Sequence, residues 1–522
     1  MEMQLPPGLD RRGFDGALAA LRRTLGEDKV FATDLDRQTY IDAYALGDGL
    51  DHQASMAIAP GTVEEVQAVV RLANEHKLPL WPVSRGRNLG YGMAAPRMAG
   101  SAVVDMTHMN KIINIDTKFA YAQLEPGVGF YQLHEHIRDN RIPLWMSVPA
   151  NGWGSVIGNA LERGIGYTPY GDHTSKLCGL EVVTPTGEIV RTGMGSMTGN
   201  KAWPHYQHGF GPSWDQMFVQ SNFGIVTKAN MWLMPEPEMS AHVQVNLPRP
   251  EDIGWAIDAL AELRLRGVIE HNIIFGNYLH DASAVTTRAD WYDGPGPLPD
   301  AIAEKIQKQF NVGWWTFHLS LFGYGRIVEQ NMKIVAEALE PRLGKKLDWK
   351  LWKRGEPIEP FGPSTGVPFV LPLNVANWMG GRGGHVGFSP IMPPSGDLAL
   401  KAFRTRKARF EAAGLDYYCS FTMGHRHIAN VNMIIFNRDD ADMVKRTKAL
   451  FTQMIADARA EGYAEYRTHI DYMDPVADTF DYNGGALMRL NERVKDAVDP
   501  NGILAPGKNG IWPARLRKER KA

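Results

Sequence analysis

The chain has 522 residues, of which 44% are hydrophobic and 22% charged, close to the averages for globular proteins. This length predicts two to four domains. The formal net charge of −2 argues against nucleic acid as the main partner, since such proteins usually carry a basic excess. No apolar run approaches the roughly 20 residues that a transmembrane helix needs, and the N-terminus lacks a signal-peptide pattern. Cys178 and Cys419 lie far apart, so we expect no disulfide framework, no metal site and a cytoplasmic location.

The N-terminal half alternates predicted strands and helices. A helix over 61–77 begins with Thr62 and Glu65, the two residues of a capping box. A hairpin turned at 185–187 is also expected. Together with these, hydrophobic periodicity predicts helices over 13–25 and 130–139, and strands at 54–60, 78–84, 101–106 and 120–128.

A proline-rich stretch at 235–250 is the predicted boundary to a second region. Two rounds of a similar pattern follow it, which predicts a repeated α+β unit. The helices are expected at 251–266, 326–340, 398–413 and 440–461, and the strands at 270–276, 314–322, 416–422 and 431–437.

The stretch "SRGRNLGYG" at 84–92 follows a predicted strand without opening a helix, which excludes a simple Rossmann assignment. Its glycines allow positive φ and close approach to a ligand. Successive amide groups in such a loop can form an anion-binding nest. The donors are Ser84, Arg87 and Asn88, so a pyrophosphate would fit, although a polar surface turn would have the same composition.

Three further stretches fit a nucleotide site. Residues 153–173 combine five glycines with Ser155 and Asn159 and predict a short helix whose N-terminus near Ser155 suits an anion. The stretch at 221–228 offers backbone groups to a flat heterocycle, and the stretch at 499–513 carries Lys508.

Together these stretches, with "GGHVGFSP" and "EYRTHIDYMD", resemble the vanillyl-alcohol oxidase and p-cresol methylhydroxylase flavoproteins, most of all the eugenol oxidase type, over roughly residues 50–515. The resemblance implies an α+β, two-domain FAD-binding fold of the p-cresol methylhydroxylase type with an α+β cap domain. We expect an N-terminal helical segment (1–50), an FAD-binding domain (51–240), a cap domain (241–498) and a C-terminal return to the FAD domain (499–522).

The resemblance also implies which residues hold FAD. His385 matches the histidine that forms a covalent bond to the flavin, although a histidine among glycines is often only a tolerated loop residue. Asp51 and His52 match a pair that assists this attachment, or else form a surface turn. The other implied FAD-binding residues are Ser84, Gly86, Arg87, Asn88, Gly90, Ser155, Gly158, Asn159, Glu162, Gly164, Gly166, Tyr167, Ile225, Val226 and Lys508.

Tyr91, Tyr466 and Arg467 match the residues that bind a phenolic oxygen in the family. A phenol has a pKa of about 10. Removing hydride from its para side chain builds positive charge, which a phenolate neutralises by forming a p-quinone methide. A cation and hydroxyl donors favour the phenolate. Alone, the tyrosines would be read as packing residues and the arginine as a salt-bridge partner.

Two positions depart from the family pattern. Ala150 stands where the oxidases carry an aspartate near the flavin, and Asn151 follows it as a residue that could orient water. Gly387 stands where a family oxidase has a bulky aromatic residue. The other expected pocket walls, which could equally be ordinary packing or surface residues, are Trp378, Tyr417, His425, His427 and Met433. No third ligand accompanies His425 and His427, so no metal is expected.

The sequence therefore predicts an FAD-dependent oxidase of para-substituted phenols of the guaiacyl or syringyl type. The resemblance implies hydride transfer from the α-carbon to flavin, reoxidation by O2 to H2O2, a role in lignin-derived aromatic breakdown, and a homodimer. Two alternatives remain open. One is a dehydrogenase that passes electrons to a cytochrome or another carrier. The other is a flavin-holding protein without turnover.

Overall fold

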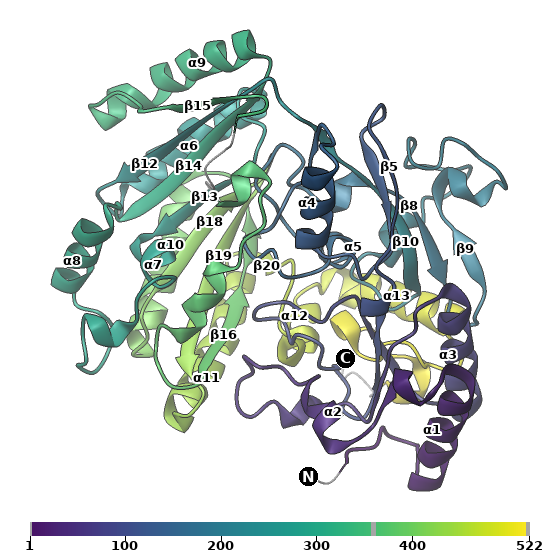
Figure 1. Ribbon diagram of the computed structural model, residues 1–522. Coiled ribbons are helices and arrows are strands. Elements are labelled where there is room, and N and C mark those ends of the chain that lie inside the picture. Colours follow the sequence, from purple (N-terminus) through teal and green to yellow (C-terminus); the bar gives the residue numbers. More distant parts are fainter. Residues whose placement is uncertain (1–2, 357–361, 518–522) are drawn as a thin grey trace.

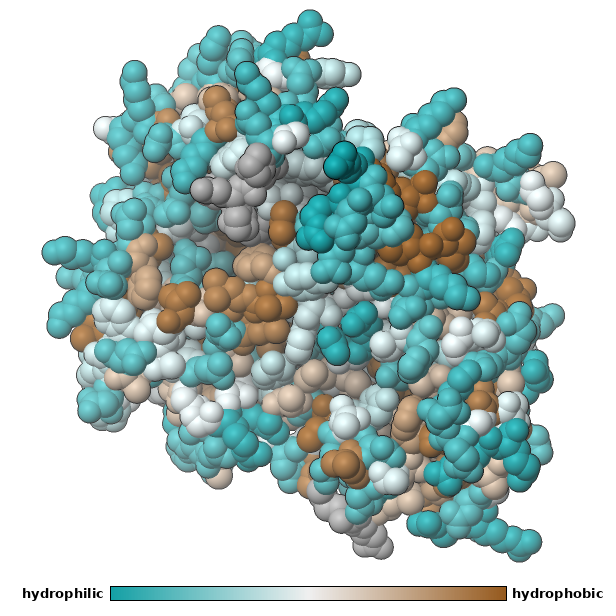
Figure 2. All heavy atoms as spheres, in the orientation of Figure 1, coloured by the Kyte–Doolittle hydropathy of each residue, from teal (hydrophilic) through white to brown (hydrophobic). Residues whose placement is uncertain are grey.

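The computed structural model describes residues 3–356 and 362–517. Figure 1 shows a large sheet with its helices on one side of the molecule and two smaller sheets on the other. On the face seen in Figure 2, hydrophilic side chains predominate and hydrophobic residues gather in a few separate patches. Within the described ranges, no helix has both the length and the apolar character needed to cross a membrane.

The first small sheet has the order β1-β2-β4-β3. Its strands are β1 (Val30–Phe31), β2 (Ala57–Ile58), β3 (Leu80–Val83) and β4 (Ala102–Asp105), and the last three run parallel. Helices α1 (Arg11–Leu25) and α3 (Val63–His76) pack on it through residues such as Phe14, Val66 and Val70. The short helix α2 (Asp34–Gln38) follows β1.

Only half of the predicted capping box forms at the start of α3. The Thr62 hydroxyl accepts the amide of Glu65, as expected. The Glu65 carboxylate, however, accepts the amide of Gly61, at 2.6 Å, and pairs with Lys29. The Glu65 carboxylate therefore has partners outside the helix, while the Thr62 amide still helps to lower its pKa.

The second small sheet is antiparallel, in the order β5-β6-β10-β8-β9. It includes the predicted hairpin, formed by β8 (Leu177–Val183) and β9 (Ile189–Arg191), and also β5 (Ile112–Asp116), β6 (Tyr121–Leu124) and β10 (Ile225–Trp232). Helices α4 (Phe130–Asp139) and α5 (Val156–Leu161) pack against it. Two short strands pair separately from this sheet: β7 (Leu144–Trp145), which follows α4, and β11 (Met234–Pro235), which follows β10.

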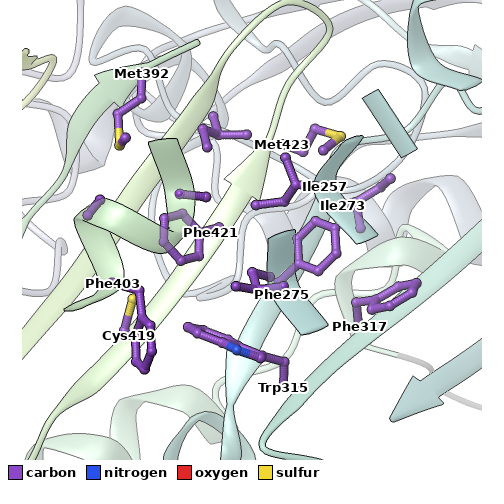
Figure 3. Packing of buried hydrophobic residues seen from close by; sticks show 14 of the residues in the cluster. Ile257, Ile273, Phe275, Trp315, Phe317, Met392, Phe403, Cys419, Phe421 and Met423 are labelled. Atoms are coloured by element: carbon purple, nitrogen blue, oxygen red, sulfur yellow. The ribbon is translucent and has the colours of Figure 1, made fainter. Parts of the chain in front are cut away.

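The large sheet has the order β15-β12-β14-β13-β18-β19-β17-β20, with β16 also paired to β19. Figure 3 shows the core on its covered face, where Phe275, Trp315, Phe317 and Phe421 pack together. The strands are β12 (Met239–Leu247), β13 (Ile273–Asn277), β14 (Trp315–Gly323), β15 (Lys350–Lys353), β16 (Gly383–Phe388), β17 (Pro390–Met392), β18 (Tyr418–Met423), β19 (Ile428–Asn437) and β20 (Ala464–Glu465).

The helices of this region are α6 (Asp252–Leu265), α7 (Tyr278–Ala282), α8 (Asp300–Phe310), α9 (Gly325–Leu343), α10 (Gly396–Ala412) and α11 (Ala441–Ala460). Four of them fall where the periodicity predicts helices. Two strand–helix rounds share one sheet, so the predicted repeated α+β unit is present.

After α12 (Met473–Ala477) and α13 (Tyr482–Val498) the chain returns to the first small sheet. The amide of Leu80 donates to the carbonyl of Ile503, and the amide of Ala505 donates to the carbonyl of Leu80, both at 2.7 Å. In Figure 1 this yellow segment lies beside the purple N-terminal elements. The buried ammonium of Lys495 ties it down by donating to the carbonyls of Asn222 and Leu504, at 2.7 and 2.6 Å.

Candidate active site

A cavity of about 390 Å³ lies between the small sheets and the large sheet. Its walls come from the loop after β3, from α5, from the segment before β10, from β16 and β19, and from the segments around 466 and 508. Stretches that are far apart in the sequence therefore meet at one place.

The loop after β3 adopts the conformation that its glycines predict. Gly86 has φ of +59° and Gly90 has φ of +83°, values that L residues rarely adopt. The Asn88 side chain closes the loop, because it accepts the Met93 amide at 2.9 Å and donates to the Met93 carbonyl at 3.1 Å. Asn88 was expected to offer this amide to a ligand. It braces the loop instead, while Arg87 stays exposed at the cavity wall.

Helix α5 begins at the predicted place, with Ser155 as its N-cap. The Ser155 hydroxyl accepts the Gly158 amide at 3.0 Å and donates to the Pro126 carbonyl at 2.5 Å. The Val156 amide donates to the Val128 carbonyl. Much of the first turn is thus already hydrogen-bonded, which leaves fewer free amides for an anion than the sequence suggested. Gly158 is required here, since a Cβ would lie 2.0 Å from the Ser84 hydroxyl.

Most of the expected FAD-binding residues line this cavity. They are Ser84, Gly86, Arg87, Asn88, Ser155, Gly158, Asn159, Glu162, Tyr167, Ile225, Val226, His385 and Lys508. Three glycines instead support the wall from behind. Gly90 lies against the His385 ring, Gly164 against the Asn159 amide, and Gly166 against Ser147 and His173. Two of the lining residues, Lys508 and Glu162, form an ion pair with each other.

His385 lies in β16 and is only 4% exposed. Burial lowers the pKa of its imidazole to about 3, so the ring is neutral at physiological pH. Neither ring nitrogen has a hydrogen-bond partner in the part of the chain that the structure describes. A neutral, desolvated imidazole with both nitrogens free is a competent nucleophile and needs a partner from a bound group.

A network of carboxylates and histidines lies close to His385. The His469 ring bonds to the Asp42 carboxylate at 2.8 Å, and His52 bonds to Asp471 at 2.6 Å. The Nδ1 of His469 lies 3.4 Å from the Asp471 carboxylate, which joins the two pairs. Burial opposes charge on His469, but Asp42 and Asp471 outweigh it and raise its pKa to about 9. The cation of His469 in turn lowers the pKa of His385.

Of the expected Asp51–His52 pair, the structure places only His52 in this network. Asp51 is exposed in a short turn, whereas the carboxylate that contacts His52 comes from Asp471, far along the chain. Sequence reasoning missed Asp42, His469 and Asp471. Asp42 and His469, like His52 and Asp471, are more than 400 residues apart in the sequence, so no local pattern indicates that they pair. Of these residues, His469 and Asp471 stand in the "EYRTHIDYMD" stretch.

Tyr91, Tyr466 and Arg467 meet at one end of the cavity. The Arg467 guanidinium carbon lies 4.1 Å from the centre of the Tyr91 ring and 5.5 Å from that of Tyr466. Gln220 donates to the Tyr466 carbonyl at 2.9 Å, and Arg467 donates to the Glu162 carbonyl at 3.4 Å. Gln220 has the left-handed φ of +47°, and it is a positioning residue that sequence reasoning missed.

The trio provides one fixed positive charge and two hydroxyl groups. Burial opposes the charge of Arg467, but Tyr91 and Tyr466 outweigh this effect and raise its pKa. Burial raises the pKa of Tyr466 to about 12, although Arg467 opposes this shift. Tyr466 therefore stays protonated at physiological pH and can donate to an anion. This is the arrangement that stabilises a bound phenolate.

The expected pocket walls divide into two groups. Ala150, Asn151, Gly387 and Met433 line the cavity. A Cβ on Gly387 would lie 3.6 Å from the Tyr91 hydroxyl, in van der Waals contact, so this glycine leaves room for a methyl-sized group beside the trio. The remaining walls that sequence reasoning missed include Trp153, Thr422 and Val431.

Four predicted walls lie elsewhere, and these expectations are corrected. Trp378 is buried and donates to Asp416 at 2.8 Å. Tyr417 packs in the core of the large sheet, 5.1 Å from the Phe410 ring. His425 and His427 belong to the turn between β18 and β19, because the strand ends at Met423. Residues 3–356 and 362–517 contain no cluster of three or more residues that could hold a metal.

Comparisons with known proteins agree with this geometry. Residues 54–193 match the FAD binding domain family, and residues 369–509 match the C-terminal domain of FAD linked oxidases. The chain is 36% identical to the 4-cresol dehydrogenase [hydroxylating] flavoprotein subunit of Pseudomonas putida, with 97% of each chain covered. It is 27% identical to the 1'-carboxy-chondrochloren decarboxylase of Chondromyces crocatus, over 97% of this chain and 99% of that one.

Solved structures give the same result. The 4-ethylphenol oxidase of Gulosibacter chungangensis, in complex with isoeugenol, superposes with a TM-score of 0.93 at 34% identity, covering 98% of this chain and 100% of the other. Substrate-bound p-cresol methylhydroxylase superposes with a TM-score of 0.92 at 36% identity, covering 97% and 99%. The predicted α+β fold of this type is therefore confirmed.

The cavity suits FAD. The unpartnered buried atoms at its walls include, within the described residues, both ring nitrogens of His385, Nε of Arg467, Oδ1 of Asn151 and the hydroxyl oxygens of Ser389 and Thr468. A ring system with carbonyl and nitrogen groups would satisfy such atoms, which are costly to leave unpaired. The chain belongs to the vanillyl-alcohol oxidase and p-cresol methylhydroxylase family, and it is an FAD-linked oxidoreductase that oxidises phenols.

Proposed function

We propose that the protein is an oxidase of para-substituted phenols that carry a 4-alkyl, 4-allyl or 4-hydroxymethyl group, with O2 as the electron acceptor. The observation that supports this most is the Arg467 guanidinium set 4.1 Å from the Tyr91 ring beside Tyr466. These groups face a cavity that also contains the free imidazole of His385. FAD, when bound, supplies the hydride acceptor, and the residues supply placement and charge.

The trio makes the substrate reactive by favouring its ionised form. Arg467 and the neutral hydroxyl of Tyr466 lower the phenol's pKa from about 10. The phenolate then pushes electrons through the ring toward the para carbon, which stabilises the quinone methide product. Ala150 cannot act as a base for later water addition, so we assign the orientation of that water to Asn151, whose Oδ1 is buried at the cavity wall without a partner in the described chain.

The need for ionisation gives a direct test with matched ligands. We expect 4-ethylphenol to reduce the bound flavin and 4-ethylanisole, its methyl ether, to leave the flavin oxidised, because the ether cannot form a phenolate. The flavin absorbance after anaerobic mixing distinguishes the two ligands. Reduction by the ether at a similar rate would contradict the proposed role of the trio.

A second candidate keeps the site and changes the electron acceptor. The similarity to the flavoprotein subunit of a 4-cresol dehydrogenase favours it. The two candidates differ in the yield of hydrogen peroxide. An oxidase forms about one equivalent of hydrogen peroxide per phenol consumed in air, whereas a dehydrogenase turns over well only when an artificial acceptor replaces the carrier protein.

We also propose that the protein is a homodimer. Light scattering on the same sample would test this oligomeric state.

We further propose that FAD is covalently attached through His385. The ring is neutral, buried and free at both nitrogens, and it lies against the backbone of Gly90. After denaturation in acid or detergent, we expect flavin fluorescence to stay with the wild-type chain and to be released from His385→Ala. His427→Ala, in the turn between β18 and β19, is the matched control and should keep its flavin. Release from the wild type would refute the attachment.

We propose that the pocket accepts substituted rings such as guaiacyl and syringyl phenols. Gly387 and Ala150 both line the cavity, and the missing side chain of Gly387 leaves room for a methyl-sized group between His385 and Tyr91. A paired steady-state comparison of 4-propylguaiacol with 4-propylsyringol tests this. A strong preference for the unsubstituted ring would argue against it.

A further inference from the structure

Glu465 is a buried carboxyl that the mechanism above does not use. It lies in β20, which pairs with β17, and it is only 4% exposed. Its Oε1 accepts the amide of Ser389 at 2.8 Å. Its Oε2 is buried and makes no hydrogen bond to any residue in 3–356 or 362–517. A carboxyl in this state is expensive to ionise and has an open position for a proton.

This carboxyl adjoins the phenol site. Glu465 directly precedes Tyr466 and Arg467, and its partner Ser389 lies two residues after Gly387. Ser389 and Thr468 both line the cavity, and the Thr468 side chain is close enough to the Glu465 carboxyl to lower its pKa. The Glu465 carboxyl therefore lies outside the cavity lining, next in sequence to the wall residues Tyr466 and Arg467.

The surroundings of Glu465 make it a weak acid. Burial raises its pKa to about 8, and Thr468, Ser389 and Arg467 oppose this shift without cancelling it. The ionisable groups that interact with it are Arg467, Tyr466 and Tyr472. Helix α11, which packs on β20, contributes apolar residues such as Met454 and Ala458 to this side.

We propose that Glu465 accepts the proton that a phenol loses when it binds as a phenolate beside Arg467. This inference rests on the proposed function. The phenol O–H bond breaks, a bond from that proton to Oε2 forms, and the total charge of the site does not change. The Thr468 side chain, which lines the cavity and interacts with this carboxyl, provides the route. Above a pH of about 8, where Glu465 is ionised, the site can then bind an anion without releasing a proton to solvent.

The proposal predicts a pH-dependent proton count. Below a pH of about 8 the Glu465 carboxyl is already protonated, so phenolate binding must release a proton to the buffer. Above that pH the carboxylate takes up the proton, and the net release falls toward zero. A site without this acceptor releases about one proton at every pH below the ligand's own pKa.

Calorimetric titration of the flavin-loaded enzyme tests this count. The ligand is 4-bromophenol, which has no α-carbon to oxidise, and two buffers of different ionisation enthalpy are used at pH 6.5 and 8.8. For the wild type we expect about one proton released at pH 6.5 and close to none at pH 8.8. For Glu465→Gln, which keeps the bond from Ser389, we expect about one at both. Glu411→Gln, on an exposed helix face, should match the wild type.

A release of about one proton at both pH values in the wild type would overturn the proposal, whether or not the variant folds. The same release in the wild type and in Glu465→Gln would overturn it as well. A failure of the proposed function looks different. In that case the bound ligand shows no phenolate absorption band and releases no proton at either pH.

Discussion

At the scale of single residues, the site depends on one buried positive charge. Arg467 lies against two tyrosine rings and has no carboxylate among its hydrogen-bond partners in the described chain, since its partner is the Glu162 carbonyl. Glu162 directs its carboxylate to Lys508 instead. The guanidinium charge therefore remains available to a ligand. A buried charge in this position favours an anionic guest strongly.

Replacement of Arg467 tests this role. Truncating one partner of a buried, charged hydrogen bond costs about 2–5 kcal/mol. We therefore expect Arg467→Met to lower kcat/KM for 4-ethylphenol by roughly 30-fold to several thousand-fold. Steady-state kinetics would measure this effect, with Arg138→Met on an exposed helix face as the control. A loss smaller than fivefold, with flavin content unchanged, would contradict the assigned role.

Single residues also mark the limit of prediction from sequence. Tyr91, His385 and Arg467 could be identified because they stand in long motifs. Asp42, Gln220 and Glu465 could not, because their roles come from contacts across the fold. His425 and His427 were misplaced because a two-residue spacing suits a strand, while Gly424 and its neighbours form the turn.

At the scale of elements, β16 connects the flavin site to the phenol site. Its residues pair in register with β19, His385 opposite Ile435 and Gly387 opposite Met433. Alternate residues of a strand share one face. His385 and Gly387 therefore lie on the same face of β16, and a Cβ on Gly387 would lie 3.7 Å from the His385 ring.

Enlarging Gly387 should change ring specificity. The position has ordinary strand backbone and a Cβ would meet nothing closer than 3.6 Å, so Gly387→Ala should fold normally. It narrows the space beside Tyr91, and filling a close-fitting space typically costs about 1–3 kcal/mol. We expect the ratio of kcat/KM for syringyl over unsubstituted 4-propylphenol to fall by roughly fivefold or more. Gly61→Ala, at a half-buried position outside the cavity, should leave the ratio unchanged.

The elements that the sequence predicted well are long and periodic. The helices α3, α4 and α11 have apolar stripes that define them locally, and the β8–β9 hairpin has a clear turn. The short strands β7, β11 and β20 have two residues each. Such strands exist only through their partners elsewhere in the fold, so no local pattern indicates them.

At the scale of the whole molecule, the stability of the large sheet should depend on pH. Burial lowers the pKa of His242 to about 4 and of His271 to about 3, and it also lowers that of His318. In the unfolded chain these groups titrate near 6.5. Between those values the unfolded state binds more protons, so unfolding becomes more favourable as the pH falls. The stabilisation is complete above about 6.5.

Thermal melting at pH 7 and at pH 5 would measure this effect. Each histidine contributes about 1.4 kcal/mol per pH unit across its window. We expect a clear fall in the melting temperature at pH 5 and a smaller fall in His242→Gln. His469 acts in the opposite sense, because its raised pKa of about 9 stabilises the fold at low pH and is lost as the pH rises through 9. A melting temperature that does not change between pH 7 and 5 would contradict this account.

The central claim is that the cavity oxidises a phenol with bound FAD, and one spectroscopic experiment tests it. The flavin-loaded protein is mixed with 4-ethylphenol in the absence of oxygen, the flavin absorbance is recorded, and air is then admitted. The account predicts rapid bleaching followed by fast recovery. Bleaching with slow recovery would support the dehydrogenase instead. No bleaching by 4-ethylphenol, eugenol or 4-propylguaiacol would contradict the assignment of this cavity to phenols.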